Sequence, residues 1–459
     1  TWVTGVQTCA LPISPPARQD VHPRRACLLS PENDGLMLLG LQGGFSGPGL
    51  ELLRSLALRG CQVIALHPTP ADASIVQLTM LLRETSGNER LYAEQCDVRS
   101  VASIRAFVKR WERDGRKGLV GDLKARIEGL VFCDGDGNGL EGVGIGLPHA
   151  LVPTPDADPL DLHHTSLLLA RHALIQLLLP TLLHSAAESP VRIILQLSPF
   201  YAASPALNPT ALNLDLQAAG SYGPYAPWVA EGQASLASLA LLRELQARVD
   251  ETRAAKGAAD SSAGIVCLAV CGGFTRAWFR TTLRADWAHP AFSWIGWLVH
   301  LVLLPIIWLL AKSAEQASQD LLLAVLGSGA RAEVPTVIGD EATKEKEKAA
   351  EGEKGAMVRK DEGRPKVRLR AGCLYRDGQE VRWVLPFWCT CDLILMLLLY
   401  RATQLEEAGP TLGPALWAVE SKRVERLVAL AEVDEKAATE AATAAKGKQK
   451  ASEKSEKAE

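Results

Sequence analysis

The chain has 459 residues, enough for one large domain or two ordinary ones with a substantial buried core. Its 49 Lys and Arg against 52 Asp and Glu give a net charge of −3, so it lacks the basic excess that nucleic acids select, and we expect no nucleic-acid partner. Ten cysteines without a C-x-x-C pair exclude a disulfide scaffold and a zinc ribbon, so we expect no metal site and an intracellular, reducing location.

Residues 1–34 precede the first regular pattern of the sequence. Residues 1–14 are similar to translated adapter sequence, and residues 15–34 are rich in Pro and Arg. We expect this lead-in to be non-native or disordered, and we exclude it from the fold.

Between residues 35 and 330, short apolar runs alternate with helical patterns. The runs predict strands at 36–41, 63–66, 91–96, 127–133, 191–197 and 265–270. The spacing of apolar residues between them predicts helices at about 50–58, 75–84, 100–112, 161–186 and 228–249. Strands that alternate with helices of this length predict βαβ units, and therefore an α/β domain with a doubly wound parallel sheet.

After this series the chain becomes more apolar. Residues 287–311 carry no formal charge, and three tryptophans near the ends of segment 294–311 resemble an interfacial aromatic belt. We expect this segment to span a membrane or to dip into one, with a buried lid over a pocket as the alternative. Three arginines precede this segment: Arg276, Arg280 and Arg284. We expect them to contact lipid phosphates or to be ordinary solvated charges.

The remaining residues predict an apolar, membrane-associated C-terminal extension. Residues 331–370 are rich in Lys and Glu and are expected to form a charged, flexible insertion. Residues 371–432 are expected to be an apolar or helical extension, in which Asp392 argues against a simple second membrane span. Residues 433–459 are expected to be a disordered charged tail.

A glycine-rich loop follows the first predicted strand and leads into the first predicted helix. Gly43, Gly47 and Gly49 would let the backbone approach a pyrophosphate, and the helix N-terminus would supply free N–H groups. No lysine follows, so a P-loop kinase is disfavoured. The alternative is an ordinary glycine turn.

In this order and spacing, the features resemble the short-chain dehydrogenase/reductase superfamily over about residues 35–330. The residues that carry the resemblance follow successive strands or begin a late helix: Gln42 to Gly49, Cys96-Asp97-Val98, Val131 to Gly135, Ser198, Cys271 to Thr275 and Lys312 to Ala317. The resemblance implies a Rossmann-like fold, an oxidoreductase, and NADP(H) or NAD(H) as cofactor.

The resemblance also implies which residues bind the cofactor: Gly43, Gly47, Gly49, His67, Asp97, Gly135 and Thr275. Asp97 would hold the adenine, although a role as N-cap of the following helix explains this residue equally well. His67 stands where an acid would bind the ribose hydroxyl of NAD, so the sequence favours NADP(H).

The catalytic residues of the family are incomplete in this sequence. No lysine occurs between Lys124 and Lys256, so the tyrosine-lysine pair Y-x-x-x-K is absent. On a gapless alignment, Gln233 stands at the lysine position and Val229 at the tyrosine position. Ser198 is the candidate that orients a carbonyl oxygen, with a strand-end hydroxyl that satisfies the backbone as the alternative. Tyr222 and Tyr225 are the candidate proton donors, or else turn residues, and His163 or His164 is another candidate acid or base.

The segments GGFSGPG, VIALHPTP and SPFYAASP, with the apolar segment before KSAEQA, resemble a branch of membrane-associated fungal members of the superfamily. We therefore expect a membrane-associated, intracellular oxidoreductase that acts on a lipophilic carbonyl or alcohol. The alternative is a catalytically degenerate Rossmann-like scaffold, a pseudoenzyme that serves as a membrane-associated interaction module. A dinucleotide, a lipophilic small molecule and a membrane are the expected partners, and the sequence leaves the oligomeric state open.

Overall fold

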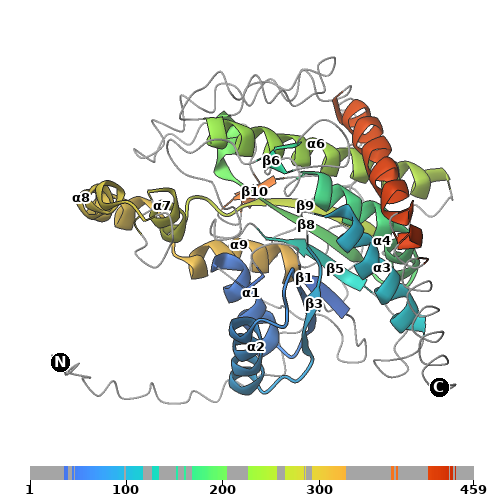
Figure 1. Ribbon diagram of the computed structural model, residues 1–459, viewed down its shortest axis with the longest axis horizontal. Helices are drawn as coiled ribbons and strands as arrows, with labels where there is room; N and C mark the ends of the chain where they lie inside the picture. Colours follow the sequence, from blue (N-terminus) through green and yellow to red (C-terminus); the bar gives the residue numbers. More distant parts are fainter. Residues whose placement is uncertain are drawn as a thin grey trace, which may run out of the picture.

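A computed structural model describes the parts of the chain that form the sheet, its covering helices and a projecting apolar helix (Figure 1). The described residues are 36–39, 44–45, 47–97, 100–116, 127–133, 151–152, 160–161, 168–203, 226–255, 264–283, 285, 292–326, 374–376, 379–380, 412–433, 435–437 and 440. The lead-in at 1–34, the insertion at 331–370 and the apolar run at 384–400 lie outside them, so these expectations stay predictions.

The centre of the structure is an eight-stranded sheet. Six of its strands match the predicted ones: β1 (Leu36–Leu39), β2 (Gln62–His67), β3 (Leu91–Gln95), β5 (Ile127–Phe132), β8 (Val191–Leu197) and β9 (Ile265–Cys271). They lie in the order β3-β2-β1-β5-β8-β9, and all neighbouring pairs are parallel. The chain moves outward from β1 to β3, crosses back to β5 and then moves outward on the other side. The expected doubly wound α/β fold is therefore confirmed.

Helices cover both faces of the sheet. One face carries α1 (Gly47–Leu58) and α9 (Ala314–Leu326), with α2 (Ala73–Ser86) beside them. The other face carries α3 (Val101–Arg116), α4 (Ala170–Glu188) and α6 (Ala226–Ala255). Every residue of β5 and of β9 is buried, because strands between two helical layers contact apolar side chains on both sides. Cys267 and Cys271 are small buried residues of β9.

The C-terminal region contributes strands that the sequence analysis did not predict. β10 (Leu374–Arg376) adds to the sheet parallel to β9, and β11 (Gln379–Glu380) pairs with β10 in the antiparallel sense. Strands this short cannot show an alternating pattern, so periodicity could not reveal them. β6 (Leu151–Val152) and β7 (Leu160–Asp161) form a separate two-stranded ladder, which is equally short.

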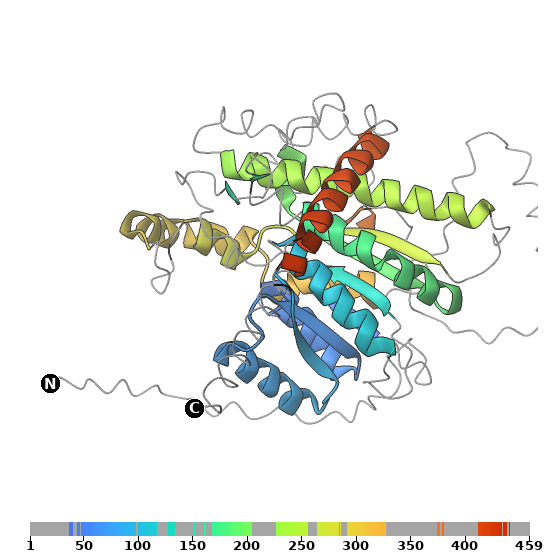
Figure 2. The same cartoon turned by 45° about the vertical axis from the view of Figure 1, so that its right-hand side comes forward.

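A C-terminal helix at 412–433 packs against α4 and α6, as Figures 1 and 2 both show. Leu416 is buried in an apolar cluster with residues of α6, and Val424 and Leu427 enter the main core. Beyond this helix, the expected disordered tail is helical at 435–437, where Glu435 pairs with Lys109 of α3 at 2.7 Å. This helix therefore belongs to the same packed body as the sheet.

The apolar segment forms α8 (Trp294–Leu310), which follows the short helix α7 (Arg276–Thr282) and projects from the body (Figures 1 and 2). Most of its large apolar side chains are exposed, and the buried one is Ile307. The alternative of a purely buried lid is therefore wrong, because most of the helix surface is exposed. Within the described part of the chain, none of the helices combines the length and the apolarity that crossing a bilayer requires.

Truncation of Leu416 tests whether the C-terminal helix folds with the sheet. Leu416→Ala should lower the free energy of unfolding by about 2–5 kcal/mol, because it leaves a cavity between this helix and α6. Chemical denaturation followed by circular dichroism measures the change. The control Lys422→Ala, at an exposed position of the same helix, should change it by less than about 0.5 kcal/mol. Equal values for the two variants would contradict this packing.

Candidate functional site

The candidate site lies at the carboxyl edge of the sheet, where the strand order reverses between β1 and β5. In open α/β sheets the connections after these two strands lead in opposite directions, so their carboxyl ends border a crevice. The loop after β1 leads here into α1, and the residues that follow β2, β3, β8 and β9 lie along the same edge. His67, Asp97 and Thr275, which end or follow these strands, therefore lie along this edge.

The first turn of α1 fits an anionic group. Gly47 has a φ of +47°, a left-handed conformation that most side chains avoid, and it stands directly at the N-terminus of the helix. Pro48 and Gly49 follow and are buried, and the first turn contains no acidic residue that would repel a phosphate. The helix therefore presents its N–H groups and its positive dipole end to the crevice. Gly43 lies outside the described residues.

His67 ends β2 and is fixed by its neighbours. Its ring packs edge-on against Phe45 of the loop after β1, with 5.8 Å between ring centroids. The backbone N–H of Thr69 donates to its Nδ1 at 3.2 Å, so Nε2 is the nitrogen that carries the ring proton. The imidazole is therefore a partly exposed hydrogen-bond donor beside the glycine loop.

Asp97 follows β3, and the structure tests its expected role as N-cap of α3. The N-cap of α3 is Ser100, whose hydroxyl accepts a hydrogen bond from the backbone N–H of Ser103 at 3.3 Å. The Ser103 hydroxyl in turn accepts from the backbone N–H of Asp97 at 2.9 Å. The N-cap role for Asp97 is therefore wrong, and this turn holds its backbone at the edge of the sheet.

Ser198 follows β8 and is buried, with 4% of its surface exposed. Its hydroxyl accepts a hydrogen bond from the backbone N–H of Phe200 at 3.4 Å, at the start of the 3-10 helix η3 (Pro199–Ala203). The expected backbone-satisfying role is thus present. This contact does not use the hydroxyl proton. It is therefore compatible with a role of Ser198 in orienting a carbonyl oxygen.

Thr275 follows β9 and joins two distant parts of the chain. Its hydroxyl accepts from the backbone N–H of Trp278 at 3.1 Å, which caps α7, and its backbone forms a parallel bridge with Lys312. The Lys312 ammonium pairs with Asp320 of α9 at 3.2 Å, and both side chains are largely buried. Sequence reasoning missed Lys312 and Asp320 as a pair, because a separation of eight residues is shared by many unpaired charges.

The family's proton-transfer residues are the weak part of the site. Gln233, at the lysine position, is buried in α6 with 9% of its surface exposed. An amide carries no charge and cannot stabilise a phenolate as an ammonium does. Tyr222, Tyr225, His163, His164 and Gly135 lie outside the described residues, so their roles stay predictions. Among the described residues, no group of His, Cys, Asp or Glu is arranged to hold a metal ion.

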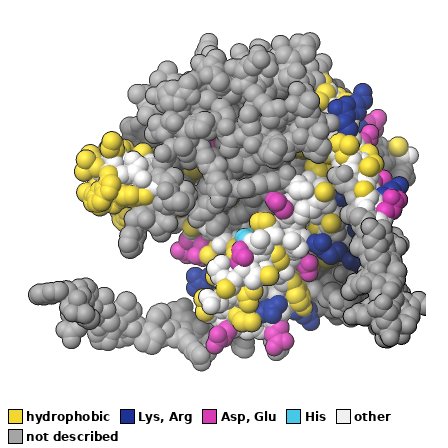
Figure 3. Space-filling view, in the orientation of Figure 1, with side chains coloured by type: hydrophobic (Ala, Val, Ile, Leu, Met, Phe, Trp, Pro, Cys, Tyr) yellow, Lys and Arg dark blue, Asp and Glu magenta, His cyan; other side chains and the backbone are white. Residues whose placement is uncertain are grey.

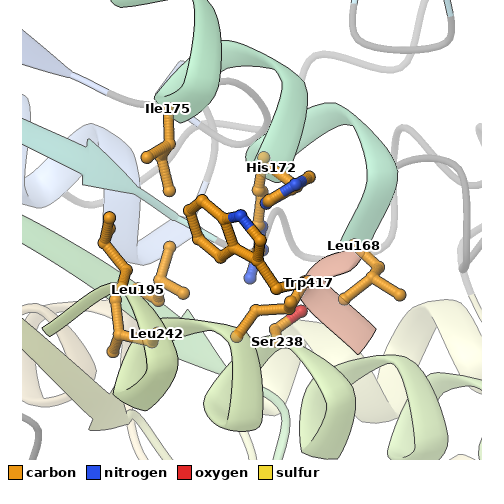
Figure 4. A pocket seen from close by; sticks show the side chains of 10 residues that line it. Leu168, His172, Ile175, Leu195, Ser238, Leu242 and Trp417 are labelled. Atoms are coloured by element: carbon orange, nitrogen blue, oxygen red, sulfur yellow. The ribbon is translucent and has the colours of Figure 1, made fainter. Parts of the chain in front are cut away.

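A small cavity lies away from this edge, where the C-terminal helix covers α4 and α6. Its volume of about 20 Å³ holds roughly one water molecule, which is far below the size of a substrate site. Trp417 closes the cavity and His172 lies beside its ring, with 4.6 Å between ring centroids (Figure 4). The guanidinium of Arg248, from α6, stacks on the Trp417 ring, 4.9 Å from its centroid. The cavity is therefore a feature of helix packing.

His172 is a buried titratable group in that packing. Burial lowers its pKa to about 4, Glu420 acts in the opposite direction, and Arg248 lowers the pKa further. Its Nε2 lies 3.2 Å from the hydroxyl of Ser421 on the C-terminal helix. The folded protein therefore holds this imidazole neutral at pH values where an exposed histidine is charged.

Comparison with known proteins gives distant relatives. No family model matches the sequence. The chain is 27% identical over 217 residues to the uncharacterized oxidoreductase pbr1 of Schizosaccharomyces pombe, which covers 47% of this chain and 52% of that protein. It is 25% identical over 287 residues to an uncharacterized oxidoreductase of Saccharomyces cerevisiae, which covers 61% of this chain and 65% of that protein. The matches thus span from about half to just under two thirds of these relatives' own lengths.

Solved structures similar to this chain are short-chain dehydrogenases. An NADPH-bound short-chain oxidoreductase from Pseudomonas aeruginosa with an atypical catalytic center is 18% identical, covers 64% of this chain and 90% of its own, and gives a TM-score of 0.39. L-Sorbose reductase from Gluconobacter frateurii, bound to NADPH and L-sorbose, is 15% identical, covers 64% and 89%, and gives 0.39. Sequence identities and TM-scores at this level do not indicate a substrate or a mechanism for this chain.

The buried histidine makes stability depend on pH. Below its ordinary pKa of 6.5, the unfolded chain binds a proton at His172 that the folded chain binds only near pH 4. The free energy of unfolding should therefore fall between about pH 6.5 and 4, by up to roughly 3 kcal/mol from this group. Urea titrations of the wild type and of His172→Gln at several pH values measure the difference.

The matched control is His184→Gln, at an exposed position of the same helix. His172→Gln should flatten the pH dependence across this window, and His184→Gln should leave it as in the wild type. The same slope in all three proteins would show that His172 is not buried neutral.

Proposed function

We propose that this chain is an oxidoreductase of the short-chain dehydrogenase type that binds NADP(H) or NAD(H) and acts on a lipophilic carbonyl or alcohol at a membrane. The single observation that carries the proposal is the first turn of α1. There Gly47, in a left-handed conformation, opens a helix N-terminus onto the point where the strand order reverses. The two yeast relatives, both named as oxidoreductases, support the reaction class.

The residues of the edge suit a dinucleotide along its length. The N-terminus of α1 would hold the pyrophosphate, and Asp97 would lie at the adenine end beyond β3. His67 would face the adenine-side ribose with a proton on Nε2, and no carboxylate ends β2 to repel a ribose phosphate. These features favour NADP(H) over NAD(H). When bound, the nicotinamide ring supplies hydride transfer, and the protein supplies its position.

Two residues of the other half of the edge would act on the substrate side. Ser198 would donate its hydroxyl proton to a carbonyl oxygen, since its backbone contact uses an acceptor position only. Thr275, held between α7 and Lys312, would fix the loop beside the nicotinamide. Tyr222 or Tyr225 is the proposed proton donor, without help from a lysine.

The proposed substrate is lipophilic because an exposed apolar helix adjoins this edge. α7 begins at the residue after Thr275, and α8 returns to the sheet at Lys312, which pairs with the backbone of Thr275. A lipophilic carbonyl or alcohol that partitions into a membrane would therefore be available close to the reacting groups.

A second candidate function keeps the dinucleotide and gives up turnover. The observation that favours it is Gln233, a buried amide at the position where the family reaction uses a lysine. Such a protein would be a dinucleotide-binding pseudoenzyme that serves as a membrane-associated interaction module. Binding and turnover must therefore be measured separately.

Dinucleotide binding is tested first by Gly47→Asp. Aspartate tolerates the left-handed conformation better than most residues, so the fold should persist while a negative charge meets the pyrophosphate. We expect at least about tenfold weaker binding of NADPH in fluorescence titration. The control Leu58→Asp introduces the same charge at an exposed position at the far end of α1, and should bind as the wild type does. Unchanged affinity in Gly47→Asp would contradict the proposal that the N-terminus of α1 holds the pyrophosphate.

Turnover is tested with NADPH and a long-chain aldehyde, by following the loss of reduced nicotinamide absorbance. Ser198→Ala should lower kcat on the order of 100-fold, because one hydrogen bond to the developing oxyanion is lost. Its NADPH affinity should not change. The control is Ser86→Ala, which removes a hydroxyl at the C-terminal end of α2, away from the carboxyl edge of the sheet. NADPH binding without turnover would contradict the oxidoreductase function and support the pseudoenzyme.

A further inference from the structure

The strongest unassigned feature is the apolar arm formed by α7 and α8. Its exposed fractions are large for apolar side chains, with Ile295 at 77%, Val302 at 68% and Leu309 at 79%. Figure 3 shows a patch of hydrophobic side chains at the left edge of the molecule, where Figure 1 places α8. A soluble monomer rarely presents a contiguous apolar surface of this kind without a partner.

Exposure over most of the circumference of α8 indicates what kind of partner fits it. Among its described residues, only the stripe that contains Gly296, His300 and Ile307 is half-buried or buried. Four consecutive residues, 301 to 304, are all exposed, and four residues complete more than one turn of a helix. Leu301, Leu304 and Trp308 lie on the side roughly opposite Ile295 and Val302. A groove in a protein, or a second copy of the helix, covers one stripe. A fluid apolar medium covers all of them.

The base of the arm is built to hold this helix in place. The parallel bridge between Thr275 and Lys312 ties the two ends of the excursion together. Arg276 donates to the carbonyl oxygens of Ala311 and Trp308, both at 3.2 Å, and stacks on the Trp308 ring at 5.0 Å. The guanidinium thus neutralises the C-terminal end of α8.

Close contact between the two helices adds to this rigidity. A Cβ at Gly296 would lie 1.7 Å from the carbonyl oxygen of Leu283, so glycine alone lets α8 cross the end of α7. The hydroxyl of Ser293 caps α8 by accepting from the backbone N–H of Gly296. The arm is therefore a formed structural element whose apolar surface stays exposed.

The charges of the arm fit an anionic surface. Among the described residues 276–283 and 292–311, the charged side chains are Arg276 and Arg280, and there is no acid. Arg276 is engaged with the end of α8, and Arg280 is exposed on α7. An exposed arginine beside an apolar helix matches the phosphates that cover the apolar layer of a phospholipid bilayer.

We propose that the arm seats in a phospholipid bilayer, with the exposed sides of α8 immersed just below the headgroups and Arg280 at the lipid phosphates. This inference rests on the membrane part of the proposed function and gives it a partner and a residue set. It does not rest on hydride transfer. Because the arm leaves and rejoins the sheet at Thr275 and Lys312, immersion brings the carboxyl edge to the membrane surface.

The test uses the full chain and vesicles of phosphatidylcholine with and without phosphatidylserine, in co-sedimentation. One triple variant places glutamates on one side of α8 at Ile295, Val302 and Leu309, and a second places them on the other side at Leu301, Leu304 and Trp308. Each should lower the partition coefficient at least tenfold. Arg280→Gln should weaken binding only to vesicles that contain phosphatidylserine, by a factor that shrinks with added salt.

The matched control carries three glutamates at exposed apolar positions elsewhere, Leu58, Met80 and Leu81, and should bind vesicles as the wild type does. Loss of binding in only one of the α8 variants would overturn immersion of both exposed sides. A wild type that ignores vesicles, or that dimerises through α8 in sedimentation velocity, would overturn the lipid partner. NADPH titration of every variant separates the two proposals, since vesicle binding without NADPH binding would contradict the proposed function alone.

Discussion

The arrangement of this molecule depends on the reversal of strand order between β1 and β5. Because the chain winds outward in both directions from this point, the first turn of α1 opens at the carboxyl edge without a neighbouring connection across it. Gly47 takes the left-handed conformation that this turn requires. The ends of β2, β3, β8 and β9 then follow along one edge, so His67, Asp97, Ser198 and Thr275 come into line although they are far apart in the sequence.

The sequence predicts the core of the fold well because long buried elements leave strong periodic signals. The six main strands begin and end within about two residues of their predicted limits, and α6 lies where the apolar spacing indicates. The helix predicted from residue 161 begins only at Ala170, as α4, and Asp161 belongs to β7 instead. β10 and β11 were missed, since three and two residues carry no period. The role of 412–433 as a cover for α4 and α6 also depends on contacts between distant segments, which local spacing does not encode.

The positions of candidate residues were predictable where a helix start or a strand end determines them, as with Gly47 and Ser198, whose roles stay predictions. Hydrogen-bond direction decided what spacing left open: Ser100 caps α3, so Asp97 does not. Arg276 was expected near lipid phosphates or in solvent, and it instead binds carbonyl oxygens at the end of α8. Such a contact spans more than 30 residues and follows from the way α7 and α8 cross, which the sequence does not display.

The buried amide of Gln233 limits how the edge can work. If Tyr222 or Tyr225 is the proton donor, as proposed, a phenol without a lysine partner has a pKa of about 10 and at neutral pH donates a proton more readily than it accepts one. The proposed turnover would therefore run as reduction of a carbonyl. NADPH is the reductant that this proposal requires, and β2 ends without the acid that would favour NAD(H). The absence of a lysine on α6 and the absence of an acid at the end of β2 therefore agree with the same proposal, the reduction of a carbonyl by NADPH.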